Sequence, residues 1–76
     1  MENSMIPHEV VSRIVDGALP VRAWREHLNL TQDEVAKRMG ISQPAFAQQE
    51  TVAKPRRATR GKIAAAFGIN ASQLEL

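Results

Sequence analysis

The chain of 76 residues contains no cysteine, so it can form neither disulfide bonds nor thiolate metal sites. This absence suits the reducing cytoplasm, which is the compartment we expect. A chain this short buries only about 60% of the surface that its unfolded form exposes. It has no disulfide bond or thiolate metal site that would compensate for the small core. We therefore expect one domain with a single small core, of marginal stability, that would gain from dimerisation.

Long apolar runs are lacking as well. Polar residues interrupt the apolar positions of the N-terminal segment at His8, Glu9, Ser12 and Arg13. We therefore expect neither a signal peptide nor a membrane span, but a soluble, intracellular protein.

Residues that carry enzymatic chemistry are few. The only histidines, His8 and His27, lie 19 positions apart, and no other residue completes a recognisable metal set. No glycine-flanked serine nucleophile or phosphate-binding glycine loop occurs. The adjacent acids Asp33 and Glu34 suit a helix N-terminus, whose field favours carboxylates. The sequence thus predicts a non-enzyme without cofactor or metal, and no small-molecule ligand is evident.

The most informative stretch, Thr31–Glu50, predicts two short helices joined by a tight turn. Thr31 and Glu34 form a capping box that begins the first helix. Gly40 supplies the positive φ that ends it, and Ser42 offers an N-cap hydroxyl for a second helix to about residue 50. This is the pattern of a helix-turn-helix.

The second helix of this pattern shows amide side chains to solvent. The helical period turns Phe46 toward the core and places four residues on the opposite face: Gln43, Pro44, Ala47 and Gln48. A glutamine amide donates and accepts at once, matching the N6/N7 edge of adenine, and an alanine can pack on a thymine methyl. Glutamine is also an ordinary surface residue, and on its own this face would not indicate DNA binding. The capped helix before it and the basic segment after it favour base contacts.

Positive charge is concentrated directly after the second helix. The net charge is only +2, but residues 51–62 carry five basic side chains and no acid, whereas residues 1–20 carry three acids and one arginine. The five are Lys54, Arg56, Arg57, Arg60 and Lys62. When a helix-turn-helix docks, a loop at this place lies beside the major groove, where lysine and arginine neutralise phosphates. The alternative is an ordinary solvated basic loop.

The remaining helices are expected to supply the scaffold. One covers residues 20–29 with Trp24 in the core, one follows Thr59 as its N-cap, and a last turn covers residues 70–74. A further helix at the N-terminus carries an apolar stripe: Ile6, Val10, Val11, Ile14 and Val15. We favour packing of this stripe on its own domain; the alternative is a dimer surface or a docking site for a second protein such as a toxin.

Residues 21–69 resemble the helix-turn-helix domain of the Cro and phage-repressor superfamily, also called the XRE family, which includes antitoxins of toxin-antitoxin pairs. The resemblance is carried by Gln32, Val35, Ala36, Met39, Gly40, Ile41, Phe46 and Glu50. It implies an all-α fold: a five-helix lambda-repressor-like helix-turn-helix domain over residues 18–76, with an additional N-terminal helix over residues 1–17, in a single domain.

The resemblance also implies roles for particular residues. Gln32 would touch a DNA phosphate, Gln43 and Gln48 would read bases, and Arg25 would form a structural ion pair with Glu50. Pro44 and Ala47 would shape the fit to the bases. The remaining phosphate contacts are expected from Ser42, Lys54, Arg56, Arg57 and Arg60.

Three positions depart from the family pattern. Gln49 stands where an apolar residue is preferred, and Arg60 replaces a usual leucine. Val52 falls where the family often has glycine, and a β-branched residue resists positive φ. We therefore expect the loop after the second helix to depart from the geometry that is usual in the family.

Together these features predict a sequence-specific double-stranded DNA-binding protein, a transcriptional repressor or autoregulator. It would act as a homodimer on a palindromic operator whose half-site centres lie roughly 34 Å apart. The alternative is an antitoxin-type interaction module that neutralises a toxin and binds DNA secondarily.

Overall fold

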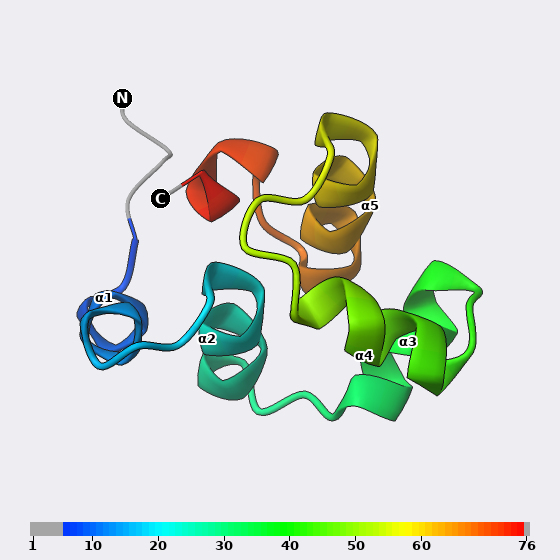
Figure 1. Ribbon diagram of the computed structural model, residues 1–76, viewed down its shortest axis with the longest axis horizontal. Coiled ribbons are helices and arrows are strands. Elements are labelled where there is room, and N and C mark those ends of the chain that lie inside the picture. The colour runs from blue at the N-terminus through cyan, green and yellow to red at the C-terminus, as the bar shows by residue number, and fades with distance from the viewer. Residues whose placement is uncertain (1–5, 76) are drawn as a thin grey trace.

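The computed structural model describes residues 6–75, which form helices and no strand. The elements are α1 (His8–Val15), α2 (Pro20–His27), α3 (Gln32–Met39), α4 (Gln43–Glu50), α5 (Arg57–Phe67) and the 3₁₀ turn η1 (Ala71–Leu74) (Figure 1). The all-α fold predicted from the sequence is confirmed. Of the five helices expected after residue 18, the last is a single 3₁₀ turn. None of the described helices has the length and apolarity that a bilayer crossing requires.

The core lies where α2, α3, α4 and α5 meet. Phe46 of α4 and Ile63 of α5 are fully buried there, as is Val35 of α3. Trp24 of α2 is almost completely buried, and its indole N–H donates to the backbone oxygen of Gln73 at 3.0 Å. This bond satisfies the polar atom of a buried ring and ties η1 to the core.

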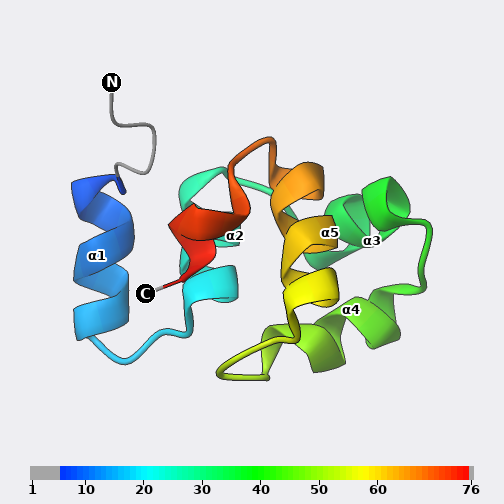
Figure 2. The ribbon, with the colours of Figure 1, turned by 90° about the horizontal axis from the view of Figure 1, so that it is seen from above.

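The helix α1 packs on α2, at the end of the molecule opposite to α3 and α4 (Figure 2). Val10 is completely buried, and Ile6 and Ile14 are partly buried against the core. Val11 and Val15 stay in solvent, with 41% and 78% of their surface exposed. The apolar stripe of α1 thus has two sides. One side packs on its own domain, and the side with Val11 and Val15 is exposed to solvent.

The start of α5 differs from the sequence-based expectation. Thr59 is not its N-cap; the helix begins at Arg57, with Arg56 in the N-cap position. The Arg56 carbonyl already accepts the amide of Arg60 at 2.8 Å, and no side chain caps the helix. The prediction was wrong because a helix can begin on backbone hydrogen bonds alone, without a capping hydroxyl.

Candidate nucleic-acid interface

The bend between α3 and α4 is built by local interactions. The Thr31 hydroxyl accepts from the Glu34 amide at 3.1 Å, and the Glu34 carboxylate accepts from the Thr31 amide at 2.8 Å. Gly40 ends α3 with φ +72°, a left-handed conformation that glycine adopts without strain. The Ser42 hydroxyl then accepts from the Ala45 amide at 3.2 Å. The predicted capping box, glycine turn and serine cap are all present, and they fix the angle at which α4 leaves α3.

The helix α4 holds the core with one face and shows the other to solvent. Phe46 is fully buried, whereas Gln43, Pro44 and Gln48 are exposed and Ala47 is half-buried. No hydrogen bond holds the Gln48 amide within residues 6–75. The four residues singled out from the sequence therefore border one accessible surface on α4.

Gln43 is not free on this surface. Its Nε2 donates to Oε1 of Gln32 at 2.6 Å, and Nε2 of Gln32 donates in turn to Oε1 of Glu50 at 2.7 Å. Gln32, at the start of α3, is thus a bridge between the outer face of α4 and a buried carboxylate. The sequence reasoning missed this link, although Gln43 and Glu50 lie seven positions apart and so share one helix face.

Arg25 of α2 forms a nearly buried ion pair with Glu50. Its Nε donates to Oε2 of Glu50, and its Nη2 lies 3.4 Å from Oε1. Its Nη1 donates to the carbonyl of Leu30 at 2.9 Å. The side chains keep only 14% and 5% of their surface exposed, and Glu50 is the one charged residue fully buried in the described part of the chain. The pair joins α2 to the C-terminal end of α4.

The loop after α4 and the first residue of α5 carry positive charge that is not paired with an acid of the described residues. Lys54, Arg56 and Arg57 are exposed, and none of them pairs with an acidic side chain of residues 6–75. Val52 lies in this loop with 46% of its surface exposed. It does not adopt positive φ, since Asn29 is the only non-glycine residue of the described chain that does. The loop therefore follows a path that needs no glycine at position 52.

Arg60 takes a position other than the one expected for a phosphate contact. Its Nη2 pairs with the Glu75 carboxylate at 3.3 Å, and its Nη1 donates to the Pro55 carbonyl at 3.5 Å. The side chain of Arg60 is directed toward the C-terminal segment, and it is only 21% exposed. With its guanidinium engaged in this way, Arg60 is less available to a phosphate than Arg56 or Arg57.

Gln49, which stands where the family pattern prefers an apolar residue, also has a visible effect on the structure. Gln49 is half-buried, and its Oε1 is buried without a hydrogen-bond partner among the described residues. The amide thus occupies a position that an apolar side chain would fill without an unsatisfied polar atom.

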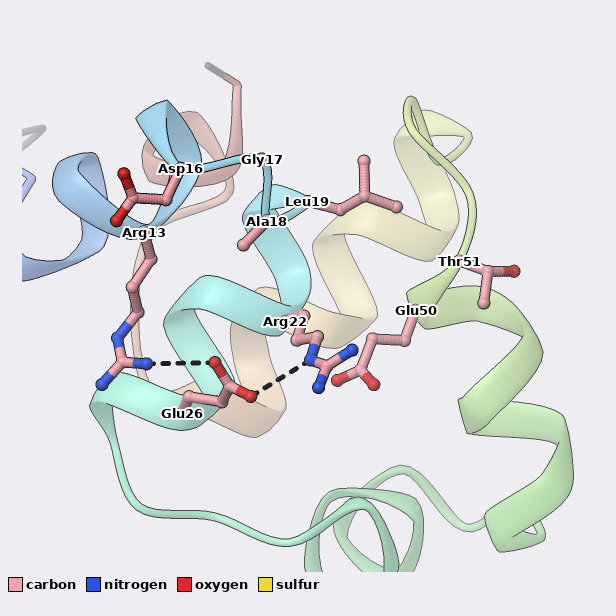
Figure 3. A pocket seen from close by; sticks show the side chains of 9 residues that line it. All are labelled: Arg13, Asp16, Gly17, Ala18, Leu19, Arg22, Glu26, Glu50 and Thr51. Carbon is pink, nitrogen blue, oxygen red and sulfur yellow. Dashed lines mark hydrogen bonds and ion pairs between the residues drawn. The ribbon is translucent and has the colours of Figure 1, made fainter.

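A cleft of about 480 Å³ lies between α1, α2 and the end of α4 (Figure 3). On its floor the Glu26 carboxylate accepts from Arg13 of α1 and from Arg22 of α2, each at 3.1 Å. The hydrogen bond from Arg22, helped by the positive charges around it, lowers the pKa of Glu26 below the ordinary value of 4.5. Both arginines are engaged by Glu26, and the ion pair of Arg13 with Glu26 joins α1 to α2.

The geometry defines a small helix-turn-helix domain with an accessible second helix. The model of the Helix-turn-helix family matches residues 21–45, which cover α2, α3, the turn and the start of α4. This part of the chain is thus similar to the Helix-turn-helix family, in line with the resemblance to the XRE and Cro-like proteins seen in the sequence. The family is generally non-enzymatic. Comparisons with curated proteins and with solved structures gave no match.

Proposed function

We propose that this protein is a sequence-specific transcriptional repressor, or autoregulator, that inserts α4 into the major groove of double-stranded DNA. The observation that carries the proposal is the pair of accessible glutamines, Gln43 and Gln48, beside a cationic loop. Glutamine amides can hydrogen-bond the edges of bases, and free lysine and arginine side chains attract phosphates regardless of sequence. The two groups of residues thus supply specificity and affinity separately.

The contacts divide between bases and phosphates. Gln43 and Gln48 read base edges, while Pro44 and Ala47 determine how closely α4 approaches them. The phosphate contacts come from Gln32 and Ser42 at the starts of α3 and α4, from Lys54 and Arg56 in the loop after α4, and from Arg57 at the start of α5. The N-termini of α3 and α4 add backbone amides, which suit an anion.

Selection from a random duplex pool, followed by salt titrations on the selected operator, tests this assignment. Gln48→Ala should cost about 1–3 kcal/mol of binding free energy on the operator and relax the preference at particular base pairs. Arg56→Ala should weaken binding to all sequences similarly and reduce the slope of log K against log salt by about 1. Arg60→Ala is the matched control, since this guanidinium faces Glu75, and it should leave the salt slope unchanged.

The opposite pattern would contradict the roles. A Gln48→Ala protein that keeps its base preference, or an Arg56→Ala protein that loses affinity for one sequence only, refutes the division of contacts. Failure of the wild-type protein to bind any duplex at low salt refutes DNA binding as a whole.

We further propose that the protein acts as a homodimer on a palindromic operator, with half-site centres roughly 34 Å apart. The support is the free apolar side of α1, where Val11 and Val15 lie four positions apart on one face. Deleting α1 would not test this, because Val10 belongs to the core. The variant Val11→Ser/Val15→Ser keeps the core, and in sedimentation experiments it should dissociate at lower concentrations than the wild type. Equal self-association would exclude this face as the dimer contact.

The same two valines favour a second candidate function, that of an antitoxin whose α1 docks a toxin protein. A reading frame for a small ribonuclease-like protein beside this gene, whose product binds the wild type but not Val11→Ser/Val15→Ser, would support it. Binding of that product to both proteins alike would place the contact elsewhere.

A further inference from the structure

Four helices of the described chain are followed by a residue with positive φ, and one of these residues is not glycine. After α1, α3 and α5 the residue is a glycine: Gly17, Gly40 and Gly68. After α2 the same place is taken by Asn29, with φ +58°. Glycine adopts this conformation without strain, and asparagine tolerates it better than most other residues. The end of α2 thus keeps a side chain where the other three ends have none.

The backbone alone closes the turn after α2. The Asn29 amide donates to the Glu26 carbonyl, and the Leu30 amide donates to the Arg25 carbonyl, each at 3.1 Å. This is the Schellman pattern, and the same two bonds close the glycine ends of α3 and α5. The Asn29 side chain is exposed, and no hydrogen bond holds it anywhere in residues 6–75. The turn therefore does not use this side chain, and its amide is free for a partner outside the chain.

Asn29 borders an open hollow of about 810 Å³ beside the proposed DNA contacts, since Gln32 and Gln43 line the same hollow. Gln32 has one of its N–H groups engaged by Glu50, whereas Asn29 keeps both. We propose that Asn29 donates a hydrogen bond to a backbone phosphate of the operator that enters this hollow. The inference rests on the proposed DNA binding and adds a contact from α2, the helix before the helix-turn-helix.

The charges around the hollow favour a neutral donor. Its two acids, Glu26 and Asp33, are each paired with basic side chains, at 3.1 Å and 3.3 Å. Its arginine, Arg25, is paired with Glu50. Since these charges are paired with one another, a phosphate in the hollow is held by N–H groups rather than by an unpaired cation. This distinguishes the contact from those of Lys54 and Arg56, which act through their charge.

The variant Asn29→Gly separates the two roles of this position, because glycine suits the backbone and removes the amide. Its Tm should stay within about 8 °C of that of the wild type. On the selected operator and on unrelated duplexes alike, binding should weaken by about 2- to 12-fold for each protomer bound, the range of one hydrogen bond. A neutral amide releases no counterion, so the slope of log K against log salt should equal that of the wild type. Arg56→Ala is the contrast, since it should reduce this slope.

The variant Asn29→Asp is a closer match in size, and aspartate also tolerates positive φ. Its carboxylate has no donor at neutral pH and repels a phosphate. Asn29→Asp should therefore bind every duplex more weakly than Asn29→Gly does.

The phosphate itself can be located with methylphosphonate linkages, which replace one phosphate at a time by an uncharged group. At one position in each half-site, the replacement should weaken the wild type more than Asn29→Gly, by about 2- to 12-fold. At the other positions the two proteins should be weakened alike, because the variant has lost only this one bond.

The outcomes separate the inference from the proposed function. A folded Asn29→Gly protein that binds the operator as tightly as the wild type overturns the inference and leaves DNA binding intact. A loss confined to one base sequence, or the absence of any coupled phosphate, overturns it as well. If the wild type binds no duplex at low salt, the proposed function and the inference fail together.

Discussion

The ion pair between Arg25 and Glu50 offers the sharpest test of how this small domain is held together. Glu50 accepts hydrogen bonds from two guanidinium nitrogens of Arg25 and from Gln32, with 5% of its side chain exposed. Arg25→Met would leave the buried carboxylate with the Gln32 amide alone. Removing one partner of a buried ion pair lowers the free energy of unfolding by about 3–5 kcal/mol. We expect about 3 kcal/mol here, because the exposure of Arg25 shows that solvent reaches one side of the pair.

The companion variant Glu50→Gln should cost less, about 2 kcal/mol, because Arg25 retains the Leu30 carbonyl and 14% of its surface in water. In the double variant neither a buried charge nor an unpaired one remains. Its cost should therefore fall short of the sum of the two single costs by about 2 kcal/mol. A domain of this size has roughly 4–11 kcal/mol of total stability, so each single change is a large fraction of it.

Unfolding in urea, followed by the fluorescence of the single tryptophan, measures these costs. Trp24 is 3% exposed in the fold and becomes solvated on unfolding, so its emission reports the transition directly. In thermal melts, a loss of about 3 kcal/mol corresponds to a decrease in Tm of about 12–24 °C. The exposed pair of Arg22 with Glu26 is the control, and Arg22→Met should cost less than about 1 kcal/mol. Additivity of the two core substitutions to within about 0.5 kcal/mol would refute the coupling.

Two further predictions concern the turn and the acid limit of stability. Gly40→Ala should lower the free energy of unfolding by about 1–2 kcal/mol, because φ is +72° there, whereas Gly61→Ala inside α5 should raise it by about 0.5–1 kcal/mol. A new Cβ meets no atom within 4 Å at either position, so equal effects in urea titrations would contradict the backbone explanation. The lowered pKa of Glu26 stabilises the fold above about pH 4.5, and this contribution is lost as the pH falls through the lowered pKa. Glu26→Gln should therefore lose less stability than the wild type as the pH falls below about 4.5, the ordinary pKa of a glutamate. Acid titrations by circular dichroism measure this difference, and parallel curves would exclude the role.

The signals that predicted the helix-turn-helix are local in the chain. A capping box needs only Thr31 and Glu34, and a left-handed helix end needs only Gly40, so both can be identified without knowing what packs against them. The start of α5 could not be found in this way. It depends on the backbone of Arg56 rather than on a capping side chain, and the nearest candidate hydroxyl, Thr59, was misleading.

The role of Arg60 shows a second limit. Within the sequence it is one of five basic residues in a short segment, and nothing local distinguishes it from Arg56 or Arg57. Its guanidinium differs from theirs because the fold brings the Glu75 carboxylate, 15 positions later in the chain, within 3.3 Å of it. Which charges are free for a phosphate is therefore a property of the folded molecule, not of the composition.

By itself, the sequence determined the elements around the bend, because hydrogen bonds between near neighbours build caps and turns. It also determined that Phe46 of α4 faces the core, since that follows from the helical period. Only the tertiary structure decided that Gln32 of α3 lies between Gln43 and Glu50 and that α1 buries one side of its stripe while leaving Val11 and Val15 exposed. Those arrangements depend on how separate helices pack, and packing brings together residues whose distance along the chain says nothing of their distance in space.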